Sequence, residues 1–114
     1  MARLSERLLK LYVPPAREYL VKAARDHRTV PYREIMNRFG GRGYVGDVLD
    51  RLNVEENAQS RPLLSAIVVR KDVRRSSRGF FALVQRLRPE VTTGNDQAVW
   101  EAECERVWTY YRSN

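Results

Sequence analysis

Five cationic side chains crowd into a nine-residue stretch of the sequence, residues 70–78, in which the single acidic residue is Asp72. The cations are Arg70, Lys71, Arg74, Arg75 and Arg78. A guanidinium group can donate two parallel hydrogen bonds to a phosphate or to a guanine edge, which an ammonium group cannot do. Because the whole chain contains 18 Arg against 3 Lys, this stretch predicts contact with a phosphate backbone.

The net charge of +7 is concentrated in the first three quarters of the chain. Residues 1–89 hold 19 Lys and Arg against 9 Asp and Glu, a net charge of +10, whereas residues 90–114 hold 2 against 5, a net charge of −3. A basic surface attracts nucleic acids and anionic membranes alike. A GC-rich coding sequence also favours Arg codons, so the charge alone does not choose a partner.

Residues for covalent or metal chemistry are scarce. The chain has one cysteine, Cys104, and one histidine, His27, so it offers neither an internal disulfide nor a His/Cys zinc site. His27 closes the apolar stripe of a predicted helix, which is typical of a partly buried helix-end residue rather than of a base. Four carboxylates of another predicted helix could hold a divalent metal for a nuclease, but a solvated helix face explains them more simply: Asp47, Asp50, Glu55 and Glu56. We therefore expect no catalytic residue, no metal and no cofactor.

Apolar spacing predicts two helices at the start of the chain. Leucines at helical intervals indicate a first helix over residues 2–12, and Pro14-Pro15 should end it because a residue before proline avoids the helical conformation. An apolar stripe with charged residues on the other side then predicts a helix over residues 16–27.

The next segments predict a short strand, a turn and a further helix. Residues 29–32 are long enough for no more than an edge strand, because Pro31 lacks a backbone donor. Residues 35–39 indicate a two-turn helix that Gly40-Gly41 terminates. Apolar residues repeat again from about Tyr44, which predicts a third helix.

A basic hairpin is expected after these helices. Residues 63–69 are apolar and β-branched at their end, and residues 79–84 combine glycine, two phenylalanines and aliphatic residues, a composition typical of paired strands. The cationic stretch 70–78 would then form the tip of the hairpin. A last helix is predicted from near Asp96, capped by Asn95, with one apolar face: Trp100, Cys104, Val107, Trp108 and Tyr111.

The predicted order is the plan of a winged helix-turn-helix, an α+β fold, with additional helices at both ends. We expect a single domain over residues 1–114, with its core at residues 15–88 and a C-terminal helix at about 95–112. A chain of this length can bury one modest core. It starts without an apolar signal sequence and contains no run of 18 apolar residues, so we expect a soluble, cytoplasmic protein without a membrane partner.

These motifs resemble the DNA-binding domain of the alkylguanine-DNA alkyltransferases and the alkyltransferase-like proteins. The resemblance covers roughly residues 29–82 and rests on Thr29-Val30, Tyr32, Glu34-Ile35, Gly40, Val45-Gly46 and Leu49, followed by an apolar strand and a glycine-aromatic strand. It implies that Tyr32 contacts a backbone phosphate. It also points to Arg42 as the residue that enters the base stack, although Arg42 lies three residues before Val45, where the family has two.

The catalytic Pro-Cys-His-Arg motif of that family is missing from this chain. The corresponding strand, residues 61–69, contains no cysteine, so a transferred alkyl group would have no thiolate acceptor. The resemblance therefore implies the fold and DNA binding without repair chemistry.

We expect a non-catalytic protein that binds duplex DNA, as a regulator of transcription or as a module that targets a partner. The expected contacts are Tyr32, Arg33, Arg42, Tyr44, Arg70, Lys71, Arg74, Arg75 and Arg78. RNA or a ribosome would suit the Arg-rich wing equally well. A protein-interaction module, such as an inhibitor or immunity protein, is favoured by the acidic third helix, and a homodimer through the last helix is a further hypothesis.

Overall fold

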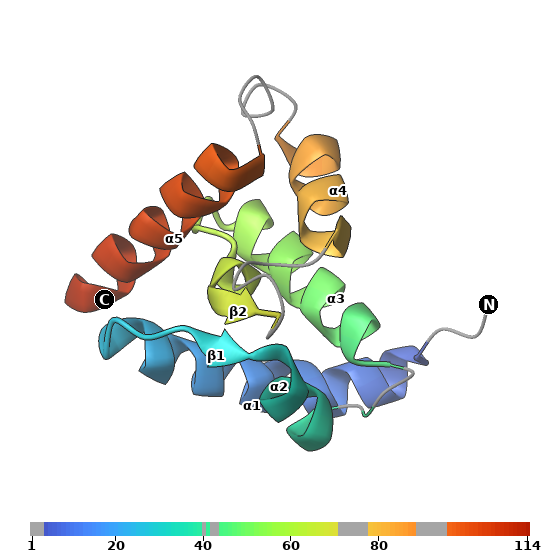
Figure 1. Ribbon diagram of the computed structural model, residues 1–114. Helices are drawn as coiled ribbons and strands as arrows, with labels where there is room; N and C mark the ends of the chain where they lie inside the picture. The colour runs from blue at the N-terminus through green and yellow to red at the C-terminus, as the bar shows by residue number, and fades with distance from the viewer. Residues whose placement is uncertain (1–3, 40, 42–43, 71–77, 89–95) are drawn as a thin grey trace.

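The computed structural model describes residues 4–39, 41, 44–70, 78–88 and 96–114 of this chain. These residues are mostly helical, with one small parallel sheet. The elements are α1 (Glu6–Arg25), β1 (Val30–Pro31), α2 (Tyr32–Arg38), α3 (Val45–Ala58), the 3-10 helix η1 (Leu64–Ile67), β2 (Val68–Val69), α4 (Arg78–Leu87) and α5 (Asp96–Ser113). In Figure 1, α1 forms the lower layer, α3 crosses above it, and α4 and α5 flank α3 at the top.

α1 is continuous through Pro14 and Pro15, so the predicted break between two helices is wrong. An interior proline costs a helix about 3 kcal/mol, because it leaves the carbonyl four residues earlier without a donor. Both prolines lie on the exposed side of α1, where those carbonyls can bond water. The opposite side is buried on both sides of the prolines, which holds the two halves in one helix: Leu9, Val13, Ala16 and Leu20.

His27, two residues beyond the end of α1, adopts the left-handed conformation with a φ of 55°. The backbone N–H groups of His27 and Arg28 donate to carbonyls of the last turn at 3.0 Å each. The imidazole ring is exposed and stacks on Trp108 of α5, with ring centroids 4.2 Å apart. The prediction of a partly buried histidine is wrong, because the residue stands beyond the helix end, where its side chain leaves the apolar stripe.

The sheet consists of two strands that run parallel, β1 and β2. Val30 pairs with Val68, and Pro31 pairs with Val69. The edge strand predicted at residues 29–32 is thereby confirmed in shorter form, and so is the short helix after it, α2. Gly41 follows α2 with a φ of +71°, which glycine adopts without steric cost, and its N–H donates to Met36 O at 2.9 Å.

Residues 79–84 belong to α4, so the predicted second strand is wrong, and with it the two-stranded wing. The apolar residues of this segment recur at helical spacing: Phe80, Leu83, Val84 and Leu87. The first three are buried and α4 packs against α3, so burial of this stripe outweighs the strand preference of its aromatic and β-branched residues. Within the predicted first strand, residues 63–69, Leu64–Ile67 form η1 and Val68–Val69 form β2, which pairs with β1 instead of with residues 79–84.

α5 completes the core, in agreement with the helix predicted from near Asp96. It packs against α1 and η1 and buries one apolar face: Val99, Cys104, Val107 and Tyr111. One cluster of buried apolar residues runs from Leu4 to Tyr111. Within the described ranges, no helix has the length and apolar character needed to cross a membrane.

Candidate nucleic-acid interface

α2 is fixed on α1 by contacts around the Tyr19 ring. The Tyr19 hydroxyl donates a hydrogen bond to the Glu34 carboxylate. The Tyr19 ring packs edge-on against the Phe39 ring, with the two ring centroids 5.7 Å apart. The Arg38 guanidinium carbon lies 4.9 Å from the centroid of the same ring, within the range of a cation–π contact. These contacts set the position of the first turn of α2, where Tyr32 and Arg33 stand.

The end of the parallel sheet brings together residues that are far apart in sequence. Pro31 is paired with Val69, so the residues that follow, Tyr32 and Arg70, leave the sheet at the same end. Arg33 and Arg70 are exposed, and Tyr32 is half-buried. Three of the predicted contact residues thus come from two segments that leave the sheet at the same end.

Tyr32 has a neutral hydroxyl whose surroundings keep it protonated. Burial, and then the negative charge of Asp50 on α3, raise the pKa of Tyr32 above its ordinary value of 10.0. A protonated phenol can donate a hydrogen bond to a phosphate. The Asp50 carboxylate repels a phosphate that approaches Tyr32. A hydrogen bond from Tyr32 to a phosphate therefore needs the positive charge of the neighbouring arginines.

The structure describes only part of the other predicted contact residues. Tyr44 is the N-cap residue of α3 and is 40% exposed. Arg42, Lys71, Arg74 and Arg75 lie outside the described residues, as does the side chain of Arg78, the first residue of α4.

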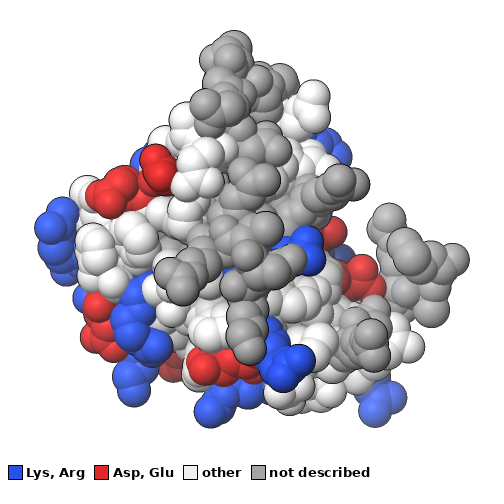
Figure 2. All heavy atoms as spheres, viewed as in Figure 1, with Lys and Arg blue, Asp and Glu red and all other residues white. Residues whose placement is uncertain are grey.

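Charge is unevenly distributed over the face shown in Figure 2. Among the described residues, blue Lys and Arg side chains lie mainly along the lower and left edges of this view, over α1, α2 and the C-terminal end of α5, with red acidic side chains between them. The α3 surface differs. Its exposed carboxylates are Asp50 and Glu55, and Asp47 accepts the Leu4 N–H at 2.9 Å.

Glu56 does not belong to the exposed acidic side of α3, so its place in the predicted solvated face is wrong. The residue is 0% exposed. Its carboxylate accepts hydrogen bonds from Arg17 Nε at 2.5 Å, Arg61 Nε at 2.8 Å and the Tyr111 hydroxyl at 2.6 Å. Burial, together with the bond to Glu56, raises the pKa of Tyr111, which keeps its hydroxyl a donor. This cluster joins α1, α3 and α5.

A second buried carboxylate, Glu103 of α5, was not singled out from the sequence. Arg88 Nη1 donates to both of its oxygens, at 2.9 and 3.1 Å, and the Leu63 N–H donates to one of them at 2.7 Å. Arg88 also donates to Asn57 Oδ1 and to Arg61 O, each at 3.0 Å. A carboxylate within the apolar stripe of α5 was the available signal, since it interrupts the stripe on its buried side.

The surroundings of the two buried carboxylates, as far as the structure describes them, are those of ion pairs. In the part of the chain that the structure describes, no group of three His, Cys, Asp or Glu side chains comes together to hold a metal ion. The buried carboxylates are neutralised by arginines instead, which is the arrangement expected of structural ion pairs.

Cys104 is expected to be an unreactive thiol in the folded protein. It is 2% exposed, and burial, reinforced by Glu103, Glu105 and Glu101, raises its pKa to about 12. Because the thiolate is the reactive form, we expect labelling at pH 8 to be at least about 100-fold slower than in the unfolded chain. A disulfide reagent that releases a coloured thiol measures both rates, and equal rates would contradict the burial. The raised pKa also means that this group's contribution to stability is lost as the pH rises from 9.0 toward 12.

Comparisons with known proteins add no family to these observations. The chain matches no protein-family model, and no curated protein and no solved structure matches it.

Proposed function

We propose that this protein binds duplex DNA without catalysis, mainly through contacts to phosphates. The observation that carries the proposal is the meeting of Tyr32, Arg33 and Arg70 at one end of the parallel sheet. Arg70 is also the first of the five cations in residues 70–78. Contacts to phosphates position a protein on DNA and supply most of its salt-dependent affinity.

The order of α2, a turn and α3 supports a helix-turn-helix at this surface. Tyr44, exposed at the start of α3, is available to a groove in that arrangement. The exposed side of α3 carries Asp50 and Glu55, which phosphates repel. In our proposal the N-terminal end of α3 therefore approaches the DNA, while the rest of α3 points away from the DNA. The resemblance to the alkyltransferase-like proteins supports the same surface through Tyr32.

The test measures DNA affinity against salt concentration. We expect Arg33→Ala and Arg70→Ala each to reduce the slope of log affinity against log salt by about one, since each removes a phosphate contact. Tyr32→Phe keeps the ring and removes the hydroxyl, which should cost about 1 kcal/mol, or about fivefold in affinity. The double variant Arg74→Ala/Arg75→Ala should weaken binding about equally for all DNA sequences.

The matched control is Arg112→Ala, which removes an exposed cation near the end of α5. It should leave the slope unchanged. The same titrations with single-stranded DNA and structured RNA distinguish the preferred nucleic acid. An affinity that does not change between low and moderate salt would contradict the proposal, as would equal slopes for the parent and the arginine variants.

A second candidate function is a protein-interaction module. The observation that favours it is the exposed side of α3, where Val54 is 39% exposed next to Glu55. A surface of this kind suits a protein partner better than a phosphate backbone. If the arginine variants bind DNA like the parent and lose a protein partner instead, this function replaces the first.

A further inference from the structure

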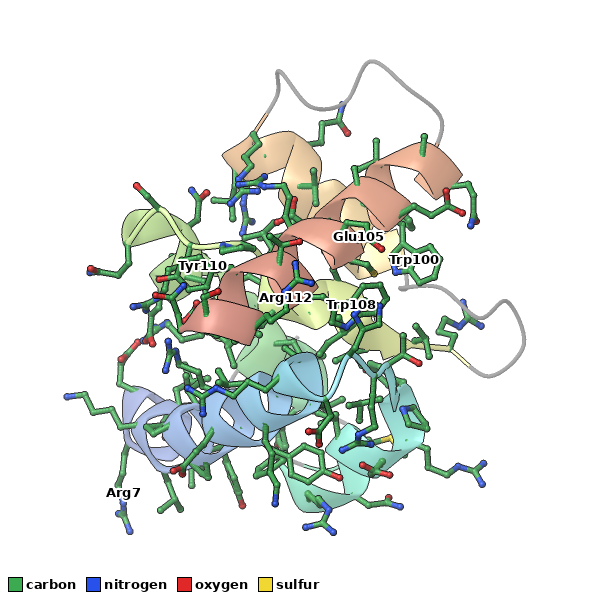
Figure 3. All side chains as sticks on the ribbon, turned by 90° about the vertical axis from the view of Figure 1, so that its left-hand side faces the viewer. Arg7, Trp100, Glu105, Trp108, Tyr110 and Arg112 are labelled. Atoms are coloured by element: carbon green, nitrogen blue, oxygen red, sulfur yellow. The ribbon has the colours of Figure 1, made fainter. Side chains whose placement is uncertain are left out.

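The outer side of α1 carries a regular stripe of four exposed residues: Arg7, Leu11, Pro14 and Glu18. Their intervals of four, three and four residues place them along one face of the helix. Leu11 is 61% exposed, more than any other large apolar side chain in the described residues. In Figure 3 the side chain of Arg7 points away from the body of the protein.

The two charged ends of this stripe have no ion-pair partner among the described residues. Arg7 and Glu18 cannot pair with each other, because eleven residues of helix separate them by about 16 Å. The stripe therefore presents a positive end, an apolar centre and a negative end, all of them open to a partner.

We propose that this stripe binds the same stripe of a second copy of the chain, with the two α1 helices antiparallel. The four positions are symmetric about a point midway between Leu11 and Pro14, because Arg7 and Glu18 lie equally far from that point along the helix. A two-fold axis through that point sets Arg7 against Glu18 of the second copy. The same axis sets Leu11 against Pro14 of the second copy.

A second copy fits this stripe because a two-fold contact requires a surface that complements itself. The antiparallel pairing makes two attractive charge contacts around an apolar centre. A parallel pairing would set Arg7 against Arg7 and Glu18 against Glu18. The small size of the stripe predicts a weak, concentration-dependent dimer.

This dimer differs from one formed through the last helix. The apolar face of α5 packs against α1 and η1 and is buried within one chain, for example at Val107 and Tyr111. The outer side of α1 instead exposes Leu11 and, at 36%, Leu8. The inference does not depend on DNA binding.

Sedimentation equilibrium of purified protein, up to millimolar concentration, tests the proposal. We expect a reversible dimer of the parent. Arg7→Glu and Glu18→Arg should each weaken it about tenfold or more, because two attractive contacts become repulsive. An equimolar mixture of these two variants should dimerise like the parent, since each Arg7→Glu chain then faces a Glu18→Arg chain with opposite charges at both contacts. Leu11→Asp should abolish the dimer.

The matched controls are Arg112→Glu and Glu105→Arg on α5, which change the net charge by the same amounts. Both residues are exposed, and Figure 3 shows them on α5, apart from Arg7. They should leave the dimer unchanged. A monomeric parent at every concentration overturns the proposal. So does a dimer that the Arg7 and Glu18 reversals do not weaken, or a mixture of the two variants that fails to restore it.

Discussion

Glu56→Ala is expected to lower the free energy of unfolding by about 3 kcal/mol or more, the usual effect of breaking a buried ion pair from one side. The carboxylate accepts bonds from Arg17, Arg61 and Tyr111. Without it, the arginines keep part of their hydration because their side chains are 34% and 26% exposed. The Tyr111 hydroxyl, in contrast, loses a buried acceptor.

The control for this substitution is the neighbouring residue. Glu55 is exposed on the same helix, so Glu55→Ala should change the free energy of unfolding by no more than about 0.5 kcal/mol. Glu56→Gln keeps an acceptor for Tyr111 and should give an intermediate loss, which remains measurable if the alanine variant does not fold. Urea unfolding followed by circular dichroism gives all three values. Equal values for Glu55→Ala and Glu56→Ala would mean that the cluster does not stabilise the fold.

Arg88→Ala is expected to cause a loss of similar size, about 3 kcal/mol, because it leaves Glu103 a buried carboxylate with less positive charge around it. Arg88 is 8% exposed and bonds Glu103, Asn57 and the Arg61 carbonyl. The Leu63 N–H and Arg106 still bond Glu103 after the substitution, so the loss is below that of a fully unpaired charge. Equilibrium unfolding in urea measures it.

Two variants show whether the effect belongs to the ion pair. Arg86→Ala removes an exposed arginine from the last turn of α4, two residues before Arg88, and should change stability by no more than about 0.5 kcal/mol. In Arg88→Ala/Glu103→Gln both charges are absent, and the double variant should be more stable than Arg88→Ala alone. A double variant that is less stable would show that charge burial is not the cause.

Helices with clear apolar stripes were predictable from the sequence. The stripe from Val45 to Leu52 and the stripe from Trp100 to Tyr111 both lie on helices where they were expected. The apolar spacing alone was sufficient to predict these two helices, because residues at helical intervals share one face only if the segment is helical. For the candidate interface, the sequence indicated which residue types could contact a phosphate. Tyr32 and Arg33 are adjacent in the chain, so they are neighbours in any fold.

The segment from Leu63 to Val69 is apolar at nearly every position, so its sequence carries no period that distinguishes a strand from a helix. Its pairing with β1, which brings Arg70 next to Tyr32, depends on contacts between residues almost forty positions apart. The helical spacing from Phe80 to Leu87 was readable, but glycine and aromatic residues favoured a strand prediction.

The sequence by itself determined the basic charge of the chain, the helices α3 and α5 and the short strand at Val30. Only the tertiary structure decided that α1 continues through Pro14 and Pro15, and that Glu56 and Glu103 are buried. In each case the deciding free energy comes from packing between distant segments. Apolar contacts on both sides of the prolines hold α1 in one piece, and arginines from other segments neutralise carboxylates that would otherwise stay in water.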